Sequence, residues 1–161
     1  MRFLVQRVRR AEVRVRQEAG WRTAGSVGQG LLLLAGFGGI DGEGLPRSPA
    51  WKRMIDKVLD LRIFPDGPDA AGKLNLSLRE AGGGVLLVSQ FTLYADCRRG
   101  RRPSFSDAAP PAGAEALYER LAADLEVALP GKVGRGVFGG DMEVELVNWG
   151  PVTIWLDSAD F

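Results

Sequence analysis

Apolar residues in this chain come in blocks, and the spacing inside each block predicts the element it forms. Residues 2–16 are rich in valine and alternate with polar residues toward their end, which predicts one long strand or two short ones. Segment 25–37 holds an unbroken apolar run, which predicts a strand buried on both faces, and segment 82–94 predicts a second buried strand entered from a glycine turn. Near the end of the chain, 142–149 and 151–158 predict two closing strands.

Two further blocks have the period of a helix. The first, 50–60, follows Ser48 and Pro49, a typical N-cap residue with proline at the first helical position. The second is 112–129. Each block carries one apolar stripe, as expected for a helix that packs on a sheet. The stripe residues are Trp51, Met54, Ile55, Val58 and Leu59 in the first block and Leu117, Leu121 and Leu125 in the second.

The order of these blocks is strands, helix, strand, helix, strands. It predicts a single α+β domain over residues 1–161, with helices packed on one face of β-sheet. Loops separate the blocks at 41–49, at the turn-rich 61–73 and at 95–111. The last of these is long and without periodicity, and long loops in compact domains are often functional.

The final apolar block is interrupted by Gly150-Pro151. Proline cannot donate a hydrogen bond to a sheet ladder, so it normally stays at strand starts, edges or bulges. The pattern therefore marks this step as one that ordinary sheet pairing does not explain.

Composition narrows the classes of function. The chain has 161 residues, 45% hydrophobic and 25% charged, with a net charge of +1. Any anion-binding site must therefore be a local patch, because no global charge drives binding to nucleic acid or membrane. The arginines within the first ten residues argue against a signal peptide, and no apolar run approaches a membrane span. A single cysteine excludes an internal disulfide and fits the cytosol, which is the expected location.

The chain contains no histidine. This excludes Ser-His-Asp and Cys-His catalysis and makes a catalytic zinc site a poor hypothesis. The polar residues Ser89, Gln90 and Thr92 follow a buried apolar run, where sites are often built. A nucleophilic Ser89 or Thr92 would need a base, and neither lysine nor histidine is adjacent. The residues thus favour hydrogen bonding to a substrate over covalent attack, and leave the type of site open.

Four arginines in five residues form a local basic patch in the long loop: Arg98, Arg99, Arg101 and Arg102. Arginine is well suited to phosphate, and Phe105 nearby could stack on a base, so the patch predicts an RNA- or phosphate-facing surface as readily as a solvated one. Cys97 lies beside the patch, but without a histidine or second cysteine it is better interpreted as an inert thiol.

Long motifs in the right order then carry a resemblance that covers nearly the whole chain. They are VQRV (5–8), KVLDLRIF (57–64), GKLNLSL (72–78), SQFTLYAD (89–96), GRRPSFSDAAPP (100–111) and VNWGPVT (147–153). The chain resembles D-aminoacyl-tRNA deacylase of the bacterial and eukaryotic type, with SQFT and GPVT as the signature pair.

The resemblance implies a homodimeric hydrolase that cleaves the ester between a D-amino acid, or glycine, and the terminal adenosine of tRNA. It implies a cis Gly-Pro bond that each subunit inserts into the pocket of the other, where main-chain groups exclude an L side chain. It also implies chemistry without a cofactor, a metal or a side-chain base, assisted by the 2′-OH of the RNA.

By motif, Ser89, Gln90, Phe91 and Thr92 would line the pocket. Gly150 and Pro151 would form the chiral filter, braced by Arg7. Phe138 and Met142 would wall the adenosine pocket, although both are also compatible with ordinary core. The four loop arginines would meet tRNA phosphates. Trp149, directly before the filter, departs from the small or polar residue that the resemblance leads us to expect.

Two alternatives remain. A tRNA-binding module that does no chemistry is compatible with the missing histidines and the near-neutral charge. A related deacylase that clears mischarged L-alanine would carry a trans Gly-Pro and other residues near SQFT, and the intact SQFT argues against it.

Overall fold

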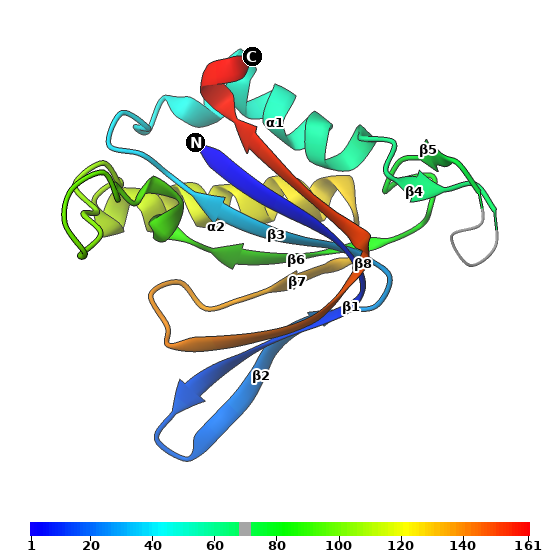
Figure 1. The fold of residues 1–161 in the computed structure, drawn as a ribbon, viewed down its shortest axis with the longest axis horizontal. Coiled ribbons are helices and arrows are strands. Elements are labelled where there is room, and N and C mark those ends of the chain that lie inside the picture. The colour runs from blue at the N-terminus through cyan, green and yellow to red at the C-terminus, as the bar shows by residue number, and fades with distance from the viewer. Residues whose placement is uncertain (68–71) are drawn as a thin grey trace.

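A computed structural model describes residues 1–67 and 72–161 of the chain (Figure 1). Part of the turn-rich loop predicted at 61–73, residues 68–71, lies outside the described residues. Within the described residues, short 3-10 helices accompany the main elements at Leu45–Arg47, Phe91–Tyr94 and Ser158–Asp160. The main elements are, in order, β1 (Arg2–Gln17), β2 (Gly20–Val27), β3 (Gly30–Gly36), α1 (Pro49–Asp60), β4 (Phe64–Pro65), β5 (Leu74–Leu76), β6 (Gly84–Ser89), α2 (Pro111–Ala128), β7 (Val133–Arg135) and β8 (Met142–Asp157).

One mixed sheet organises the molecule. Its strand order is β2-β1-β3-β6-β7, and β8 pairs with β1. The pairs β3–β6 and β6–β7 are parallel, whereas β1 is antiparallel to β2, β3 and β8. The 16-residue β1 leaves β3 after Val8 and pairs with β2 from Ala11 onward, so the sheet curls on itself (Figure 1).

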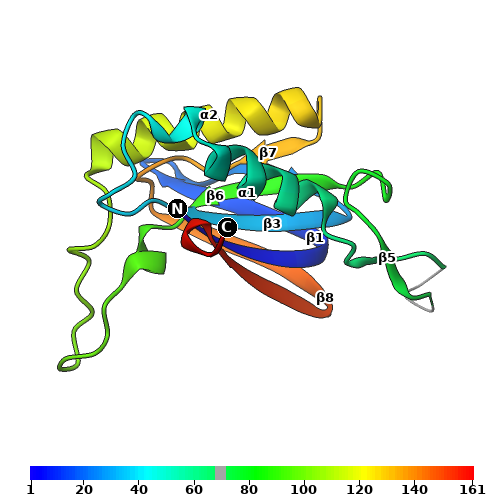
Figure 2. The same cartoon turned by 90° about the horizontal axis from the view of Figure 1, so that it is seen from above.

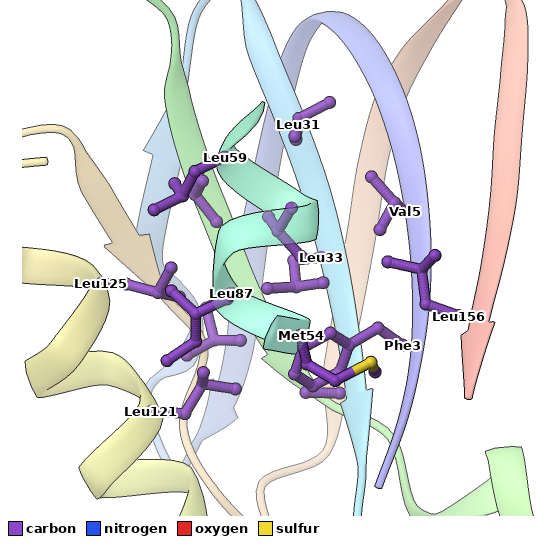
Figure 3. Close-up of a cluster of buried hydrophobic side chains, with 14 of the residues drawn as sticks. Phe3, Val5, Leu31, Leu33, Met54, Leu59, Leu87, Leu121, Leu125 and Leu156 are labelled. Atoms are coloured by element: carbon purple, nitrogen blue, oxygen red, sulfur yellow. The ribbon is translucent and has the colours of Figure 1, made fainter. Parts of the chain in front are cut away.

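Both helices cover one face of this sheet, as the α+β prediction requires. Side chains of α1 and α2 meet Leu31, Leu33 and Leu87, which project from β3 and β6 toward the helices (Figure 3). Burying a leucine fully contributes about 1.5–3 kcal/mol, so each buried leucine of this layer stabilises the fold. On the other face, a smaller cluster including Leu32 and Leu86 is covered by the first half of β8.

The helix predictions are confirmed. The Ser48 hydroxyl accepts a hydrogen bond from the Trp51 N–H at 3.2 Å, which caps α1. The indole N–H of Trp51 donates to Asp124 of α2 at 2.8 Å and so joins the two helices. Every residue of the two predicted apolar stripes is buried. In the part of the chain that the structure describes, no helix is both long and apolar enough to cross a membrane.

The prediction of one strand at 25–37 is wrong. Its first residues end β2 at Val27, and β3 begins at Gly30 after the turn at Gly28. The sequence pattern did not reveal this turn because only β3 has a strong hydrophobic signal. β2 is largely exposed and polar, so its end at Val27 could not be recognised. The three-residue β7 was missed for a related reason, since it is too short to show a period.

The prediction of a strand at 82–94 is also wrong at its end. β6 stops at Ser89, and Phe91–Tyr94 form a 3-10 helix. The neighbouring strand β3 ends at Gly36, so the backbone beyond Gln90 has no strand to pair with. A local apolar pattern does not indicate where the neighbouring strand in the sheet ends.

The two predicted closing strands are a single strand, β8, that contains a bulge. Its pairing with β1 steps from Gln6–Thr153 to Val8–Asn148, so Arg7 alone faces the four residues 149–152. Gly150-Pro151 lies inside this bulge, where proline interrupts no ladder bond. Gly150 has φ of 124°, which favours glycine, and the Gly150–Pro151 peptide bond is cis.

Candidate active site

The polar segment after β6 is fixed by backbone contacts. Ser89 pairs with Ala35 at the end of β3, and the Gln90 N–H donates to the Ala35 carbonyl at 2.7 Å. The chain then turns into the 3-10 helix, whose end is closed by the Ala95 N–H donating to the Thr92 carbonyl at 3.0 Å. The segment therefore lies at the carboxyl ends of parallel strands, a common place for ligand sites.

Two cavities adjoin this segment. The larger has a volume of about 480 Å³ and the smaller about 250 Å³. Ser89, Gln90, Phe91 and Gly139 line both, so they form a wall shared by the two. A group bound in one cavity can therefore be joined to a group in the other across a wall that carries hydrogen-bonding side chains.

The larger cavity is mainly apolar and contains four phenylalanines: Phe37, Phe91, Phe105 and Phe138. The rings of Phe91 and Phe105 meet edge to face with centroids 5.0 Å apart, and their side chains are 55% and 40% exposed. Exposed aromatic faces beside a cavity offer a stacking surface for a planar ligand.

Phe105 reaches the cavity from the long loop that projects from the body of the molecule (Figure 2). The base of this loop is pinned by the Gly38–Ala108 bridge and by the Gly39 N–H, which donates to the Asp107 carbonyl at 2.9 Å. The sequence indicates Phe105 only as a residue beside the basic patch. Phe37 was missed because its apolar strand gave no sign that the side chain borders a cavity.

Phe138 and Met142 lie in adjoining cavities. Phe138 lines the larger one and Met142 the smaller, and the Val137 N–H donates to the Met142 sulfur at 3.3 Å. Behind Phe138, the Tyr118 hydroxyl donates to the carbonyls of Leu87 and Gly136, each at 3.1 Å. Burial raises the pKa of Tyr118 to about 12, which keeps the hydroxyl protonated and able to donate.

Gln90 and Thr92 are joined directly, because the Gln90 side-chain amide donates to the Thr92 hydroxyl. A hydroxyl that accepts from an amide gains no basic partner, so this pair can orient a substrate but does not activate Thr92 as a nucleophile. The arrangement agrees with a hydrogen-bonding role for both residues.

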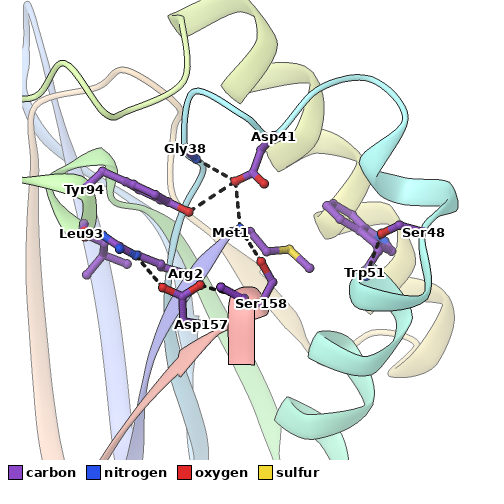
Figure 4. A network of polar contacts seen from close by, with 11 residues as sticks. Met1, Arg2, Gly38, Asp41, Ser48, Trp51, Leu93, Tyr94, Asp157 and Ser158 are labelled. Carbon is purple, nitrogen blue, oxygen red and sulfur yellow. Dashed lines mark hydrogen bonds and ion pairs between the residues drawn. The ribbon is translucent and has the colours of Figure 1, made fainter. Parts of the chain in front are cut away.

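A polar network anchors the 3-10 helix from behind (Figure 4). Arg2 donates to Asp157 at 2.8 Å and to the Leu93 carbonyl at 3.0 Å. Asp41 accepts from the Gly38 N–H at 2.7 Å and from the Tyr94 hydroxyl at 3.4 Å, and it pairs with the Met1 ammonium group at 2.9 Å. Burial raises the pKa of Tyr94, so its hydroxyl stays a donor to the carboxylate. The network fixes the ends of the segments that border the larger cavity.

The bulge of β8 lies at the opposite end of the sheet (Figure 1). Gly150 lies eight residues along β8 from Met142, beside the smaller cavity, which is about 26 Å of strand at 3.3 Å per residue. Gly150 and Pro151 are both exposed and line neither of the cavities at Ser89. Within one chain, the two halves of the predicted site are therefore apart.

Arg7 holds the bulge. Its side chain is buried, and its Nε donates to the Trp149 carbonyl at 2.9 Å while a terminal nitrogen donates to the Ile63 carbonyl. A Cβ on Gly150 would lie 2.7 Å from the Arg7 guanidinium. Burial, followed by the charge of Arg9, lowers the pKa of Arg7. Arg7 thus replaces with its side chain the ladder bond that the bulge removes from Trp149.

Asn148 holds the other end of the bulge. Its side-chain oxygen accepts from the Val152 N–H at 3.3 Å, and its amide donates to the Thr153 hydroxyl at 3.0 Å. Both backbone groups that flank Gly150-Pro151 therefore have side-chain partners. The sequence predicted only a strand over 142–149 and gave no sign of this role for Asn148, because the role depends on the bulge.

The loop arginines differ from one another. Arg98 makes two side-chain hydrogen bonds to Asp96, both at 2.8 Å, which lowers the pKa of Asp96 to about 2. Arg99, Arg101 and Arg102 are exposed on the projecting loop. Cys97 is exposed as well. Among the described residues, no group of three or more histidine, cysteine, aspartate or glutamate side chains could hold a metal.

The fold and the cavities together define an α+β protein whose candidate site combines apolar rings with hydrogen-bonding groups at strand ends. A family profile described as D-Tyr-tRNA(Tyr) deacylase matches residues 4–157. A D-aminoacyl-tRNA deacylase of Solidesulfovibrio magneticus is 61% identical, with 99% of this chain and 97% of the relative covered. One from Thermomicrobium roseum is 52% identical, with 99% and 96% covered. The chain belongs to the D-Tyr-tRNA(Tyr) deacylase family, a family of hydrolases that act on ester bonds.

Two solved structures share this fold. The structure of a c-Myc DNA unwinding element binding protein is similar with a TM-score of 0.83 and 33% identity, covering 98% of each chain. A probable eukaryotic D-amino acid tRNA deacylase is similar with a TM-score of 0.78, covering 96% of this chain and 97% of the other. At 20% identity, the second likeness shows the fold alone.

Proposed function

We propose that this protein hydrolyses the ester bond of D-aminoacyl-tRNA and releases the free D-amino acid and tRNA. The observation that carries the proposal is the shared wall of Ser89, Gln90 and Phe91 between two cavities, in a chain of the deacylase family. An aminoacyl ester has two parts, the terminal adenosine and the amino acid, and each would occupy one of the two cavities. Its reacting carbonyl would then lie at the polar wall between them.

The larger cavity suits the terminal adenosine. Its volume of about 480 Å³ lies within the range of small-molecule sites, and its phenylalanine rings can stack on a base. Phe138 lies in this cavity, and Met142 supports the segment that carries it. The exposed arginines Arg99, Arg101 and Arg102 lie on the projecting loop and would meet phosphates of the tRNA, with Arg98 held by Asp96.

The proposed chemistry needs no cofactor. Water adds to the ester carbonyl carbon, the bond to the ribose oxygen breaks, and that oxygen takes up a proton. Backbone N–H groups at the start of the 3-10 helix and the Gln90 amide would orient the carbonyl and stabilise its developing negative charge. The neighbouring 2′-OH of the ribose would assist in place of a side-chain base, which fits a chain without histidine.

Selectivity would come from a second copy of the chain. Gly150-Pro151 is exposed and lies far from the cavities of its own chain, so it can meet a substrate there only from a partner. In the proposed homodimer, each bulge enters the site of the other subunit and its main chain leaves no room for an L side chain at Cα. The L-aminoacyl ester is rejected because its side chain would clash with the main chain of the bulge, and no attractive contact to the D side chain is needed. Glycine lacks a side chain, so glycyl-tRNA mischarged on tRNA-Ala would also be cleaved.

The first experiment measures hydrolysis of D-tyrosyl-tRNA and L-tyrosyl-tRNA by the purified protein, with light scattering to give its mass. We expect cleavage of the D ester only, by a dimer. Equal rates on the two esters would contradict the chiral filter, and an active monomer would contradict the shared site. A substrate with a terminal 2′-deoxyribose should be cleaved at least about 100-fold more slowly if the 2′-OH assists.

The alternative is a tRNA-binding module without chemistry in the same cytoplasmic setting. It predicts tight binding of aminoacyl-tRNA with the ester intact after hours of incubation. The basic loop supports binding under either hypothesis, so ester loss is the measurement that separates them.

A further inference from the structure

Trp149 begins the bulge of β8, and its side chain packs against two arginines of β1. The guanidinium carbon of Arg9 lies 3.6 Å from the centre of the indole ring, and that of Arg7 lies 4.4 Å from it. The ring of Phe64 meets the indole edge to face at 6.3 Å. Trp149 is thus partly buried, whereas the next two residues, Gly150 and Pro151, are exposed.

The position of the indole has an electrostatic consequence. Burial, followed by the nearby charge of Arg9, lowers the pKa of Arg7, so the charged form of the Arg7 guanidinium is disfavoured. The face of an indole carries negative potential and attracts cations. Trp149 therefore offsets the repulsion between two arginines that the alternation of β1 places close together.

The same residue provides the backbone atom that Arg7 holds. The Trp149 carbonyl accepts the hydrogen bond from Arg7 Nε at 2.9 Å, directly before Gly150. The indole fixes the Arg7 side chain, and Arg7 fixes the peptide that enters the Gly150-Pro151 turn. Arg9, which is exposed, closes this arrangement from the solvent side.

We propose that Trp149, clamped by Arg9, is a positioning residue that sets the placement of the Gly150-Pro151 turn and so the discrimination between D- and L-aminoacyl esters. This role rests on the proposed function, since it assumes that the turn meets the substrate in a partner subunit. Trp149 itself touches the arginines and Phe64, and acts on the reaction through the turn.

The test compares kcat and KM on D-tyrosyl-, glycyl- and L-tyrosyl-tRNA for four single variants and for the double variant of Trp149→Ala with Arg9→Ala. Trp149→Ala and Arg9→Ala each remove one partner of the clamp, Trp149→Phe keeps an aromatic face, and Arg10→Ala is the matched control. Arg10 neighbours Arg9 on β1 but pairs with Glu145 at 3.1 Å. Arg9 and Arg10 are both exposed, so neither alanine variant disturbs the core. Arg9→Ala therefore still tests the clamp if Trp149→Ala fails to fold.

We expect Trp149→Ala to lower the D-to-L ratio of kcat/KM about tenfold, mainly through kcat, with Arg9→Ala losing about fivefold. The double variant should lose no more than Trp149→Ala alone, because both changes break one contact. Trp149→Phe should recover most of the selectivity, and Arg10→Ala should match the wild type. Unchanged D-to-L ratios in Trp149→Ala and Arg9→Ala, or fully additive losses, would overturn the positioning role.

An NMR measurement tests the clamp without any activity. The side-chain protons of Arg9 should be shifted upfield by the indole ring in the wild type and return to ordinary values in Trp149→Ala. Arg9 protons without a ring shift in the wild type would overturn the clamp. A wild-type protein that shows the shift but cleaves neither ester would overturn the proposed function instead, and the selectivity role with it.

Discussion

At the end of β6, the segment Ser89–Thr92 is held by backbone groups, whereas at the other end of the sheet the bulge 149–152 is held by side chains. The first depends on the Gln90 N–H and the Ala35 carbonyl, 2.7 Å apart. The second depends on Arg7 and Asn148, whose side chains replace the missing ladder bonds. A backbone contact survives most substitutions, but a side-chain contact is lost with one residue. The bulge should therefore be far more sensitive to point mutation than the cavity wall.

Gly150→Ala should have the largest effect on this comparison. The added Cβ would lie 2.7 Å from the Arg7 guanidinium at φ of 124°, so the bulge must move. We expect a loss of about 100-fold or more in kcat/KM on D-tyrosyl-tRNA, because small displacements of a positioned group are costly. Gly20→Ala is the matched control, since Gly20 has φ of 113° and nothing within 4 Å of its added Cβ. Equal activities of the two variants would contradict the role of the bulge.

Asn148→Ala should come next. It leaves the Val152 N–H without its side-chain partner, which costs about 1–3 kcal/mol for a buried group and less where water can replace the lost partner. We expect about a tenfold loss of kcat/KM and a small fall in the urea midpoint. Thr153→Val serves as a control, because it removes a hydrogen bond to the Asn148 amide but keeps the bond to Val152. If Thr153→Val loses as much activity as Asn148→Ala, the bond to Val152 is not the decisive contact.

Tyr118→Phe tests the cavity side of the comparison. The change removes the hydroxyl that donates to the Leu87 and Gly136 carbonyls, so the free energy of unfolding should fall by about 1–2 kcal/mol. Because backbone bonds still hold Ser89–Thr92, kcat/KM at 25 °C should stay within about fivefold of the wild type. A loss of activity as large as that of Gly150→Ala would mean that the cavity wall also depends on single side chains.

Thr92→Ala should have the smallest effect. The Thr92 hydroxyl accepts from the Gln90 amide at an exposed position, where water can replace it, so activity should stay within about threefold. Single-turnover rates on D-tyrosyl-tRNA measure this directly. A loss of several orders of magnitude would restore a nucleophile and reject the hydrogen-bonding role.

Much of the fold could be predicted from local patterns. The stripes of α1 and α2, the Ser48 cap and the buried runs of β3 and β6 followed from periodicity, because each reflects contacts between residues near in sequence or one continuous buried face. The turn at Gly28, the end of β6 and the extent of β8 could not be predicted, because each depends on where a neighbouring strand begins or ends.

The candidate site divides in the same way. The sequence singled out the motifs around Ser89 and Gly150 and the residue Arg7, and the structure shows that Arg7 donates to the Trp149 carbonyl. Phe37 and Asn148 were missed, since Phe37 gains its position from two loops that meet at the cavity, and Asn148 gains its role only once the bulge has formed. Trp149 stood out from the sequence without an explanation.

The sequence by itself determined the α+β class, the helices, the absence of histidine chemistry and the family, because these depend on composition, local period and long motifs. The tertiary structure decided that Gly150-Pro151 lies in a bulge opposite Arg7 and that this bulge is remote from the cavities of its own chain. It also decided that Trp149 lies over two arginines. These facts depend on the register of β8 against β1, and register is a relation between distant segments that no local pattern specifies.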